Sequence, residues 1–158
     1  MNAGMKALLI DNLKKLRLST MLRNLESLNR QAKQEKLSYE EFLLNLSEVE
    51  VQTRQENGRK RRLREAKFPI LKPMETFKFD AAPELDVRLM KELSNCDYVK
   101  KSRNIIFVGK SGTGKTHLAT ALGMEACKQG VRTRFVTGCG LANELIEARH
   151  ERELSRVI

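Results

Sequence analysis

Apolar residues recur at helical spacing through the first 66 positions of the chain. Leucines and methionines lie three or four residues apart, and no glycine occurs between positions 5 and 57. This spacing places the apolar side chains on one face of a helix. Ser38 is followed three residues later by Glu41, the form of a capping box, in which each side chain bonds the other's backbone amide. The pattern predicts three helices, two shorter and one longer, the last running from Tyr39 towards Arg64.

The pattern changes after position 66. All three prolines fall within 67–83, together with three phenylalanines, which indicates a connector that packs against another part of the protein. Helical spacing returns over 84–94. The run Ile-Ile-Phe-Val at 105–108 is typical of a strand that is buried on both faces. A second strand is predicted over 132–137, followed by a helix over 141–153.

Directly after the first predicted strand stands G-K-S-G-T-G-K-T, a full match to the phosphate-binding pattern G-x-x-x-x-G-K-[ST]. Its glycines let the backbone turn its amides towards phosphate oxygens, and the following helix adds its positive N-terminal end. The Lys115 ammonium is expected on the β- and γ-phosphates of ATP, and the Thr116 hydroxyl on Mg²⁺. A chance match is the competing interpretation, and the flanking strand and helix argue against it. The predicted ATP-binding residues are Gly109, Lys110, Ser111, Gly112, Thr113, Gly114, Lys115 and Thr116.

Strand–helix alternation around this loop predicts an α/β fold with a parallel sheet. We therefore expect a helical N-terminal domain over 1–66, a connector over 67–83, and a partial P-loop ATP-binding domain over 84–158.

Three stretches together resemble a known family. They are L-S-Y-E-E-F-L at 37–43, R-E-A-K-F-P at 64–69, and the segment 107–123 with its core G-K-T-H-L-A. The chain is similar to the IstB-like ATP-binding helpers of insertion sequences, which are related to the DnaC-like helicase loaders. The resemblance implies an AAA+ ATPase domain after the N-terminal helices, assembly on DNA as a homo-oligomer, and assistance to a transposase. It also adds His117 to the nucleotide-binding residues; taken alone, His117 is an ordinary first-turn helix residue.

One departure from the implied AAA+ pattern concerns catalysis. Such enzymes need a second acidic motif on a strand after the loop, a sensor residue and an arginine finger. The predicted strand at 132–137 carries no acid at its end. The apolar run at 7–10, which Asp11 follows, imitates an acidic strand end but continues into a helix. We therefore expect a C-terminally truncated family member that binds ATP but does not hydrolyse it.

The charge balance points to a polyanionic partner. The chain carries 30 Lys and Arg against 20 Asp and Glu, a net charge of +10, and nucleic acid is the partner that this favours. The densest cluster falls at the end of the third predicted helix, where it is interpreted as a contact to DNA phosphates. A solvated helix end favoured by the helix dipole is the alternative. The cluster consists of Arg59, Lys60, Arg61, Arg62 and Arg64.

The cysteine spacing and the hydropathy pattern argue against several other classes of protein. The three cysteines form no C-x-x-C pair, which disfavours a metal site and a disulfide framework. The N-terminal apolar run at 7–10 is too short for a signal peptide or a membrane span, so we expect a cytoplasmic protein with no membrane partner. Two functions stay open beside the transposition helper: a helicase loader, and a DNA-binding or interaction module with a vestigial nucleotide site.

Overall fold

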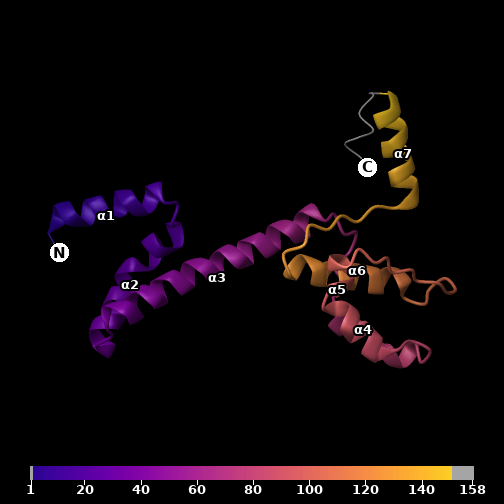
Figure 1. Ribbon diagram of the computed structural model, residues 1–158, viewed down its shortest axis with the longest axis horizontal. Coiled ribbons are helices and arrows are strands. Elements are labelled where there is room, and N and C mark those ends of the chain that lie inside the picture. The colour runs from indigo at the N-terminus through magenta and orange to yellow at the C-terminus, as the bar shows by residue number, and fades with distance from the viewer. Residues whose placement is uncertain (1, 151–158) are drawn as a thin grey trace. The chain divides into compact units, whose positions relative to one another are not determined.

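The computed structural model describes residues 2–150, and the regular structure in this range is helical (Figure 1). The chain divides into two units, Met1–Gly58 and Arg59–Ile158. The first unit holds α1 (Ala3–Lys15), α2 (Ser19–Glu35) and most of α3 (Tyr39–Glu65). These bounds confirm the three helices predicted from the apolar spacing. The second unit holds the end of α3, then η1 (Met74–Thr76), η2 (Phe79–Ala81), α4 (Val87–Ser94), α5 (Asp97–Lys100), α6 (Lys115–Lys128) and α7 (Gly138–His150).

Local sequence sets the junction between α2 and α3. Lys36 ends α2 in the left-handed backbone conformation, with φ +54°. The predicted capping box then starts α3. The Ser38 amide donates to Glu41 Oε2 at 2.8 Å, and the Glu41 amide donates to Ser38 Oγ at 3.2 Å. Two of the amides that a helix start leaves without partners are thereby satisfied.

The start of α2 is capped from a distant helix. Its N-cap residue, Leu18, offers no side-chain hydrogen bond. Instead Glu50 of α3, which is only 4% exposed, accepts the amides of Thr20 and Met21, each at 2.9 Å. Arg54 Nε donates to the other carboxylate oxygen at 2.7 Å. Burial acts to raise the pKa of Glu50, but the hydrogen bonds from Met21, Arg54 and Thr20 outweigh it and lower that pKa below its ordinary value.

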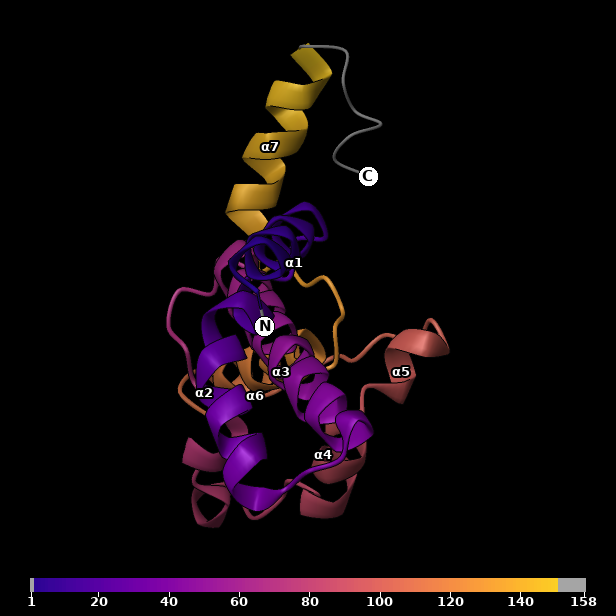
Figure 2. The ribbon, with the colours of Figure 1, turned by 90° about the vertical axis from the view of Figure 1, so that its left-hand side faces the viewer.

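Helix α6 lies at the centre of the second unit and is covered on two faces (Figures 1 and 2). Leu118 and Leu122 form one face and pack with Met90 of α4. Gly123 and Cys127 lie five positions further along, about 140° around the helix at 3.6 residues per turn. On that second face, Gly123 meets Phe68, which follows α3, and Thr133. Partly buried residues that complete the first face are Met74, Phe77, Phe79, Leu85, Leu93, Ile105 and Phe107.

The predicted parallel sheet, and with it the α/β class, is wrong for the part of the chain that the structure describes. No strand is present in residues 2–150; segments 104–110 and 131–137 have no regular secondary structure and no ladder of backbone bonds to a neighbour. A strand forms only where another extended segment supplies the matching amides and carbonyls. Segment 131–137 instead makes one backbone bond to the end of α3, from the Phe135 amide to the Ala66 carbonyl at 2.8 Å.

The apolar run at 105–108 is buried on one face only. Ile105 and Phe107 pack on the core around α6. Ile106 and Val108 point the other way and are 82% and 91% exposed. Residue type predicted an extended backbone, but the number of covered faces depends on neighbours that a local pattern does not specify.

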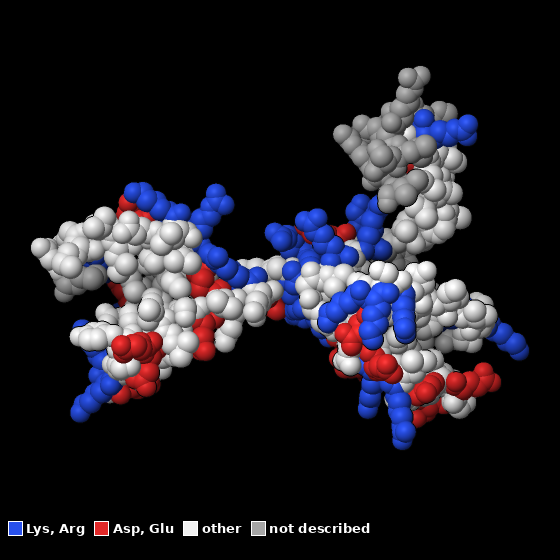
Figure 3. All heavy atoms as spheres, viewed as in Figure 1, with Lys and Arg blue, Asp and Glu red and all other residues white. Residues whose placement is uncertain are grey.

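Basic side chains gather over the C-terminal end of α3 (Figure 3). The three cysteines, Cys96, Cys127 and Cys139, are free thiols. Among the described residues, no helix combines the length and apolar character that a membrane span requires.

Candidate phosphate-binding site

The loop 109–116 joins an extended segment to the first turn of α6. Gly112 and Gly114 have φ values of +81° and +88°, the left-handed region that only glycine adopts readily. Gly114 is also the N-cap of α6, so the loop ends at the positive end of the helix. The Thr113 hydroxyl donates to the Lys110 carbonyl at 2.9 Å, which closes the turn from within.

Lys115 holds its ammonium against the loop. Nζ donates to the carbonyls of Gly109 and Lys110, at 2.8 and 2.6 Å. The charge therefore lies beside the loop rather than extended into solvent. Thr116, the next residue, is exposed on the first turn of α6. An ammonium, a helix N-terminus and a left-handed glycine loop together fit a phosphate group.

The connector packs directly on this loop. A Cβ placed on Gly114 would lie 2.6 Å from Cε2 of Phe77, so the aromatic ring occupies the space that any other residue would need. The Phe77 ring also packs edge-on against Phe79, with centroids 5.0 Å apart. The expectation that aromatics of the connector pack against another part of the protein is confirmed. The phenylalanines of the connector predicted such packing, but not which glycine the ring would contact.

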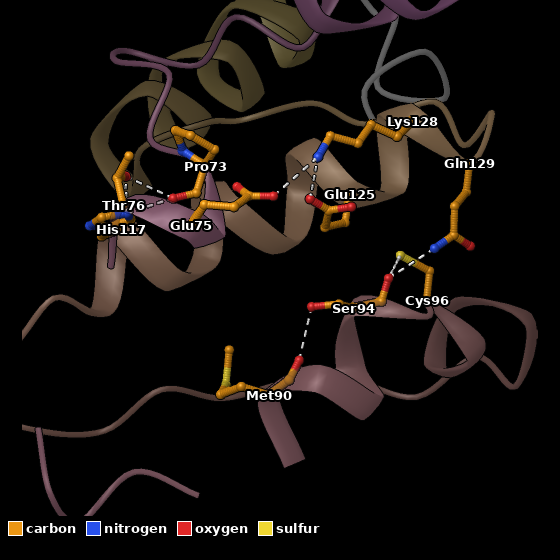
Figure 4. A network of polar contacts seen from close by, with 10 residues as sticks. All are labelled: Pro73, Glu75, Thr76, Met90, Ser94, Cys96, His117, Glu125, Lys128 and Gln129. Atoms are coloured by element: carbon orange, nitrogen blue, oxygen red, sulfur yellow. Dashed lines mark hydrogen bonds and ion pairs between the residues drawn. The ribbon is translucent and has the colours of Figure 1, made fainter. Parts of the chain in front are cut away.

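His117 ties the connector to the start of α6 (Figure 4). Its Nε2 lies 3.2 Å from the Pro73 carbonyl and 3.3 Å from the Thr76 hydroxyl, which itself donates to Pro73 at 2.8 Å. The His117 ring also meets the Phe77 ring, with centroids 5.2 Å apart. Two kinds of contact therefore hold the connector beside Lys115 and Thr116.

The opposite end of α6 is tied as well. Lys128 Nζ donates to Glu125 at 2.6 Å and lies 3.9 Å from a carboxylate oxygen of Glu75 in η1 (Figure 4). Gln129 Nε2 donates to the Ser94 carbonyl at the end of α4, at 2.9 Å. These bonds fix α6, and hence the loop at its start, relative to the connector and α4.

A hollow of about 420 Å³ opens between the connector and the loop. Its walls combine aromatic and small side chains with two lysines, and they include the three central loop residues. The sequence pattern indicated the loop, and the family resemblance added His117, but neither indicated the connector side of this hollow. The lining residues are Lys72, Thr76, Phe77, Lys78, Ala81, Ala82, Gly112, Thr113, Gly114 and His117.

Some side chains of the basic cluster at the end of α3 make contacts within the protein. Arg62 Nε donates to the Cys127 carbonyl at 2.8 Å; this carbonyl, at the C-terminal end of α6, also accepts the Gly130 amide at 3.2 Å. Arg61 Nε lies 3.8 Å from a carboxylate oxygen of Glu65, while Arg64 is exposed. Arg62 thus has a structural contact that the charge pattern did not indicate. Arg59 and Lys60, the other members of the cluster, also make polar contacts.

Comparison with known proteins covers both units. The family described as IstB-like ATP binding protein matches residues 11–158. The chain belongs to this family. The ATP-binding protein of insertion sequence IS5376 from Geobacillus stearothermophilus is 35% identical over 142 residues, which are 90% of this chain and 57% of that protein. The corresponding protein of IS21 from Pseudomonas aeruginosa is 36% identical over 144 residues, 91% of this chain and 54% of that protein.

This IstB-like chain spans about half the length of the curated relatives that it matches. Membership confirms the resemblance inferred from the sequence and places the chain among ATP-binding proteins of insertion sequences. The loop, the ammonium of Lys115 and the N-terminus of α6 are the parts of this IstB-like structure that fit a triphosphate.

Proposed function

We propose that this chain binds ATP, with the phosphates in the loop 109–116, and assists the transposition of an insertion sequence. The observation that carries the proposal is the loop itself: left-handed Gly112 and Gly114 lead into α6, and the Lys115 ammonium lies against the loop. Its nitrogen donates there to two neutral carbonyls, and a phosphate can replace them as a negatively charged and therefore stronger acceptor. The predicted division into a helical region over 1–66, a connector over 67–83 and a nucleotide-binding region over 84–158 is part of this proposal.

The hollow beside the loop accommodates the rest of the nucleotide. Phe77 offers a flat apolar ring, and Lys72 and Lys78 place positive charge at the same walls. Thr116 is the residue that would hold Mg²⁺, because its exposed hydroxyl follows directly on Lys115. When bound, the ion neutralises charge on the phosphate oxygens.

Exchange of one charge tests the assignment. Lys115→Ala should remove most affinity for a fluorescent ATP analogue, because the ammonium on the phosphates is lost. Lys101→Ala is the matched control: it removes the same charge from an exposed position in the same unit, after α5. Equal affinity of the Lys115→Ala variant and the unaltered chain would rule out this loop as the phosphate site.

We further propose that this 158-residue chain alone does not turn ATP over. Phosphoryl transfer to water needs Mg²⁺ held from more than one side and a group that orients the water. Among the described residues, the hollow at the loop is lined by no carboxylate. The measurement is phosphate release in the presence of DNA, with Lys115→Ala as the background. Release clearly above that background would contradict the proposal, and Asp11 would be the first acid to replace.

DNA and a transposase are the partners that fit the basic cluster and the family. Arg59, Lys60, Arg61, Arg62 and Arg64 are proposed to contact DNA phosphates, with Arg62 shared between DNA and the Cys127 carbonyl. Capture of the chain by a transposase, but not by a replicative helicase, is the expected result of a paired pull-down. Capture by the helicase alone would favour a helicase loader instead. If the chain binds DNA but not nucleotide, and added nucleotide leaves its affinity for DNA unchanged, a simple DNA-binding module would be favoured.

A further inference from the structure

Two further arginines, Arg132 and Arg134, lie beside the basic cluster but belong to a separate segment of the chain, 131–137. Half-buried and exposed residues alternate along 131–136, the pattern of a segment whose successive side chains lie on two faces. Thr133 and Phe135 face inward: Thr133 Cγ2 is 3.4 Å from the Cβ position of Gly123, and the Phe135 ring meets Phe68 at 6.3 Å. Arg132 and Arg134 are the exposed residues between and before them.

The two basic segments lie next to each other. The Phe135 amide bonds the Ala66 carbonyl at the end of α3. Arg62 and Arg132 line one hollow of about 340 Å³, together with Glu65 and Thr133. The Glu65 carboxylate also lies 3.8 Å from Arg61, so its charge is already partly offset. Packing of the inward residues therefore fixes where the outward arginines stand.

We propose that these arginines form one composite surface for the phosphate backbone of nucleic acid, here called the arginine face. The proposal rests on the proposed DNA-binding function and extends it to residues outside the cluster. The planar fork of an arginine side chain can bind two phosphate oxygens at once. Contacts to phosphate oxygens carry no sequence information, so the surface is expected to bind duplexes of different sequence alike. The arginine face consists of Arg61, Arg62, Arg64, Arg132 and Arg134.

One member of the arginine face is already paired with a carboxylate. Arg134 forms an ion pair with Glu144 of α7, and both side chains are partly exposed. Arg132 has no ion pair among the described residues. Nucleic acid is therefore expected to engage Arg132 directly and Arg134 only in competition with Glu144.

The first test is the salt dependence of binding. Anisotropy of a fluorescein-labelled duplex of mixed sequence is followed with the full chain over a series of KCl concentrations. Arg132→Ala should weaken binding about two- to five-fold and lower the slope of log K against log[KCl] by up to ~0.9. The matched control is Arg88→Ala, an exposed arginine on α4, which covers a different face of α6 from the residues after α3 (Figures 1 and 2). Equal slopes for the two variants would overturn the arginine face.

The second test removes the competing acid. Glu144→Gln should strengthen duplex binding and steepen the salt slope, because Arg134 is released to the phosphates. Glu147→Gln removes the same charge from an exposed position one turn later in α7 and should have less effect. The same gain from both variants would show a general charge effect and overturn the role of Arg134.

Two further measurements separate the possible failures. A variant in which Arg59, Arg61 and Arg64 are all Ala tests the proposed DNA contact itself. If it weakens binding and Arg132→Ala does not, the proposed function stands and the arginine face fails; if neither weakens binding, both fail. Competition by polyglutamate as strong as that of unlabelled duplex at equal charge would overturn the choice of nucleic acid as the partner.

Discussion

Replacement of Gly114 by alanine separates two costs that coincide in the phosphate loop. The first is backbone strain, because φ is +88° and a left-handed L-residue costs about 1–2 kcal/mol. The second is overpacking, because the new Cβ would lie 2.6 Å from Phe77 Cε2, and forced insertion of a methyl group costs about 1–3 kcal/mol. Gly114→Ala should therefore lower the free energy of unfolding by about 2–5 kcal/mol.

Substitution at two other glycines separates the backbone strain from the overpacking. Gly112 has φ +81° with nothing within 4 Å of its Cβ position, so Gly112→Ala should show strain only, about 1–2 kcal/mol. Gly123 is helical, but its Cβ position is 2.8 Å from Phe68 Cζ. Gly123→Ala should show overpacking, offset by about 1 kcal/mol of improved helix propensity. The assay is urea unfolding followed by circular dichroism, with the midpoints compared across the three variants.

A double-mutant cycle tests whether Phe77 is the cause. Phe77→Leu shortens the side chain that meets the new methyl group, so it should cost less in the Gly114→Ala background than in the unaltered chain. Gly114→Ala should also lose affinity for the ATP analogue, since displacement of Phe77 disturbs the loop. The reasoning is refuted if Gly114→Ala unfolds at the same urea concentration as Gly112→Ala and shows no coupling to Phe77.

Two further predictions concern single contacts. Glu50→Gln should destabilise the first unit by about 2–3 kcal/mol near neutral pH, because charge-assisted bonds to the amides at the start of α2 are weakened. Since the folded pKa of Glu50 is lowered, its contribution is complete above the unfolded pKa of about 4.3 and is lost as pH falls through the folded pKa; a difference in stability that stays constant down to acid pH would speak against it. His117→Ala should weaken binding of the ATP analogue about 5- to 10-fold, because the connector loses the bonds at Pro73 and Thr76. Affinity equal to that of Lys101→Ala would show that this tie does not position the loop.

The sequence by itself determined the features that depend on near neighbours in the chain. The capping box joins residues three positions apart, and helical spacing of apolar residues repeats within a single turn. Both are local geometry, so the sequence predicted two shorter helices and one longer one, together with the bounds of the longer one, α3. The phosphate loop is likewise one continuous segment between an extended run and a helix. Together with the stretches at 37–43 and 64–69, that segment was sufficient to indicate the IstB-like family.

Tertiary structure alone decided which distant groups meet. Glu50 caps a helix 30 residues earlier in the chain, and Arg62 reaches a carbonyl 65 residues later. No local period encodes such pairs, because they depend on how whole helices pack. The same reason explains why the predicted sheet is absent from the described residues. The residue types at 105–108 are those of a strand, but a ladder of backbone bonds needs a second strand beside it. In the described chain, α4 and α6 pack against one face of this segment instead. The same packing leaves Arg132 exposed and Phe135 half-buried. Alternating side chains create two faces, and only the neighbouring elements decide which of the two is buried.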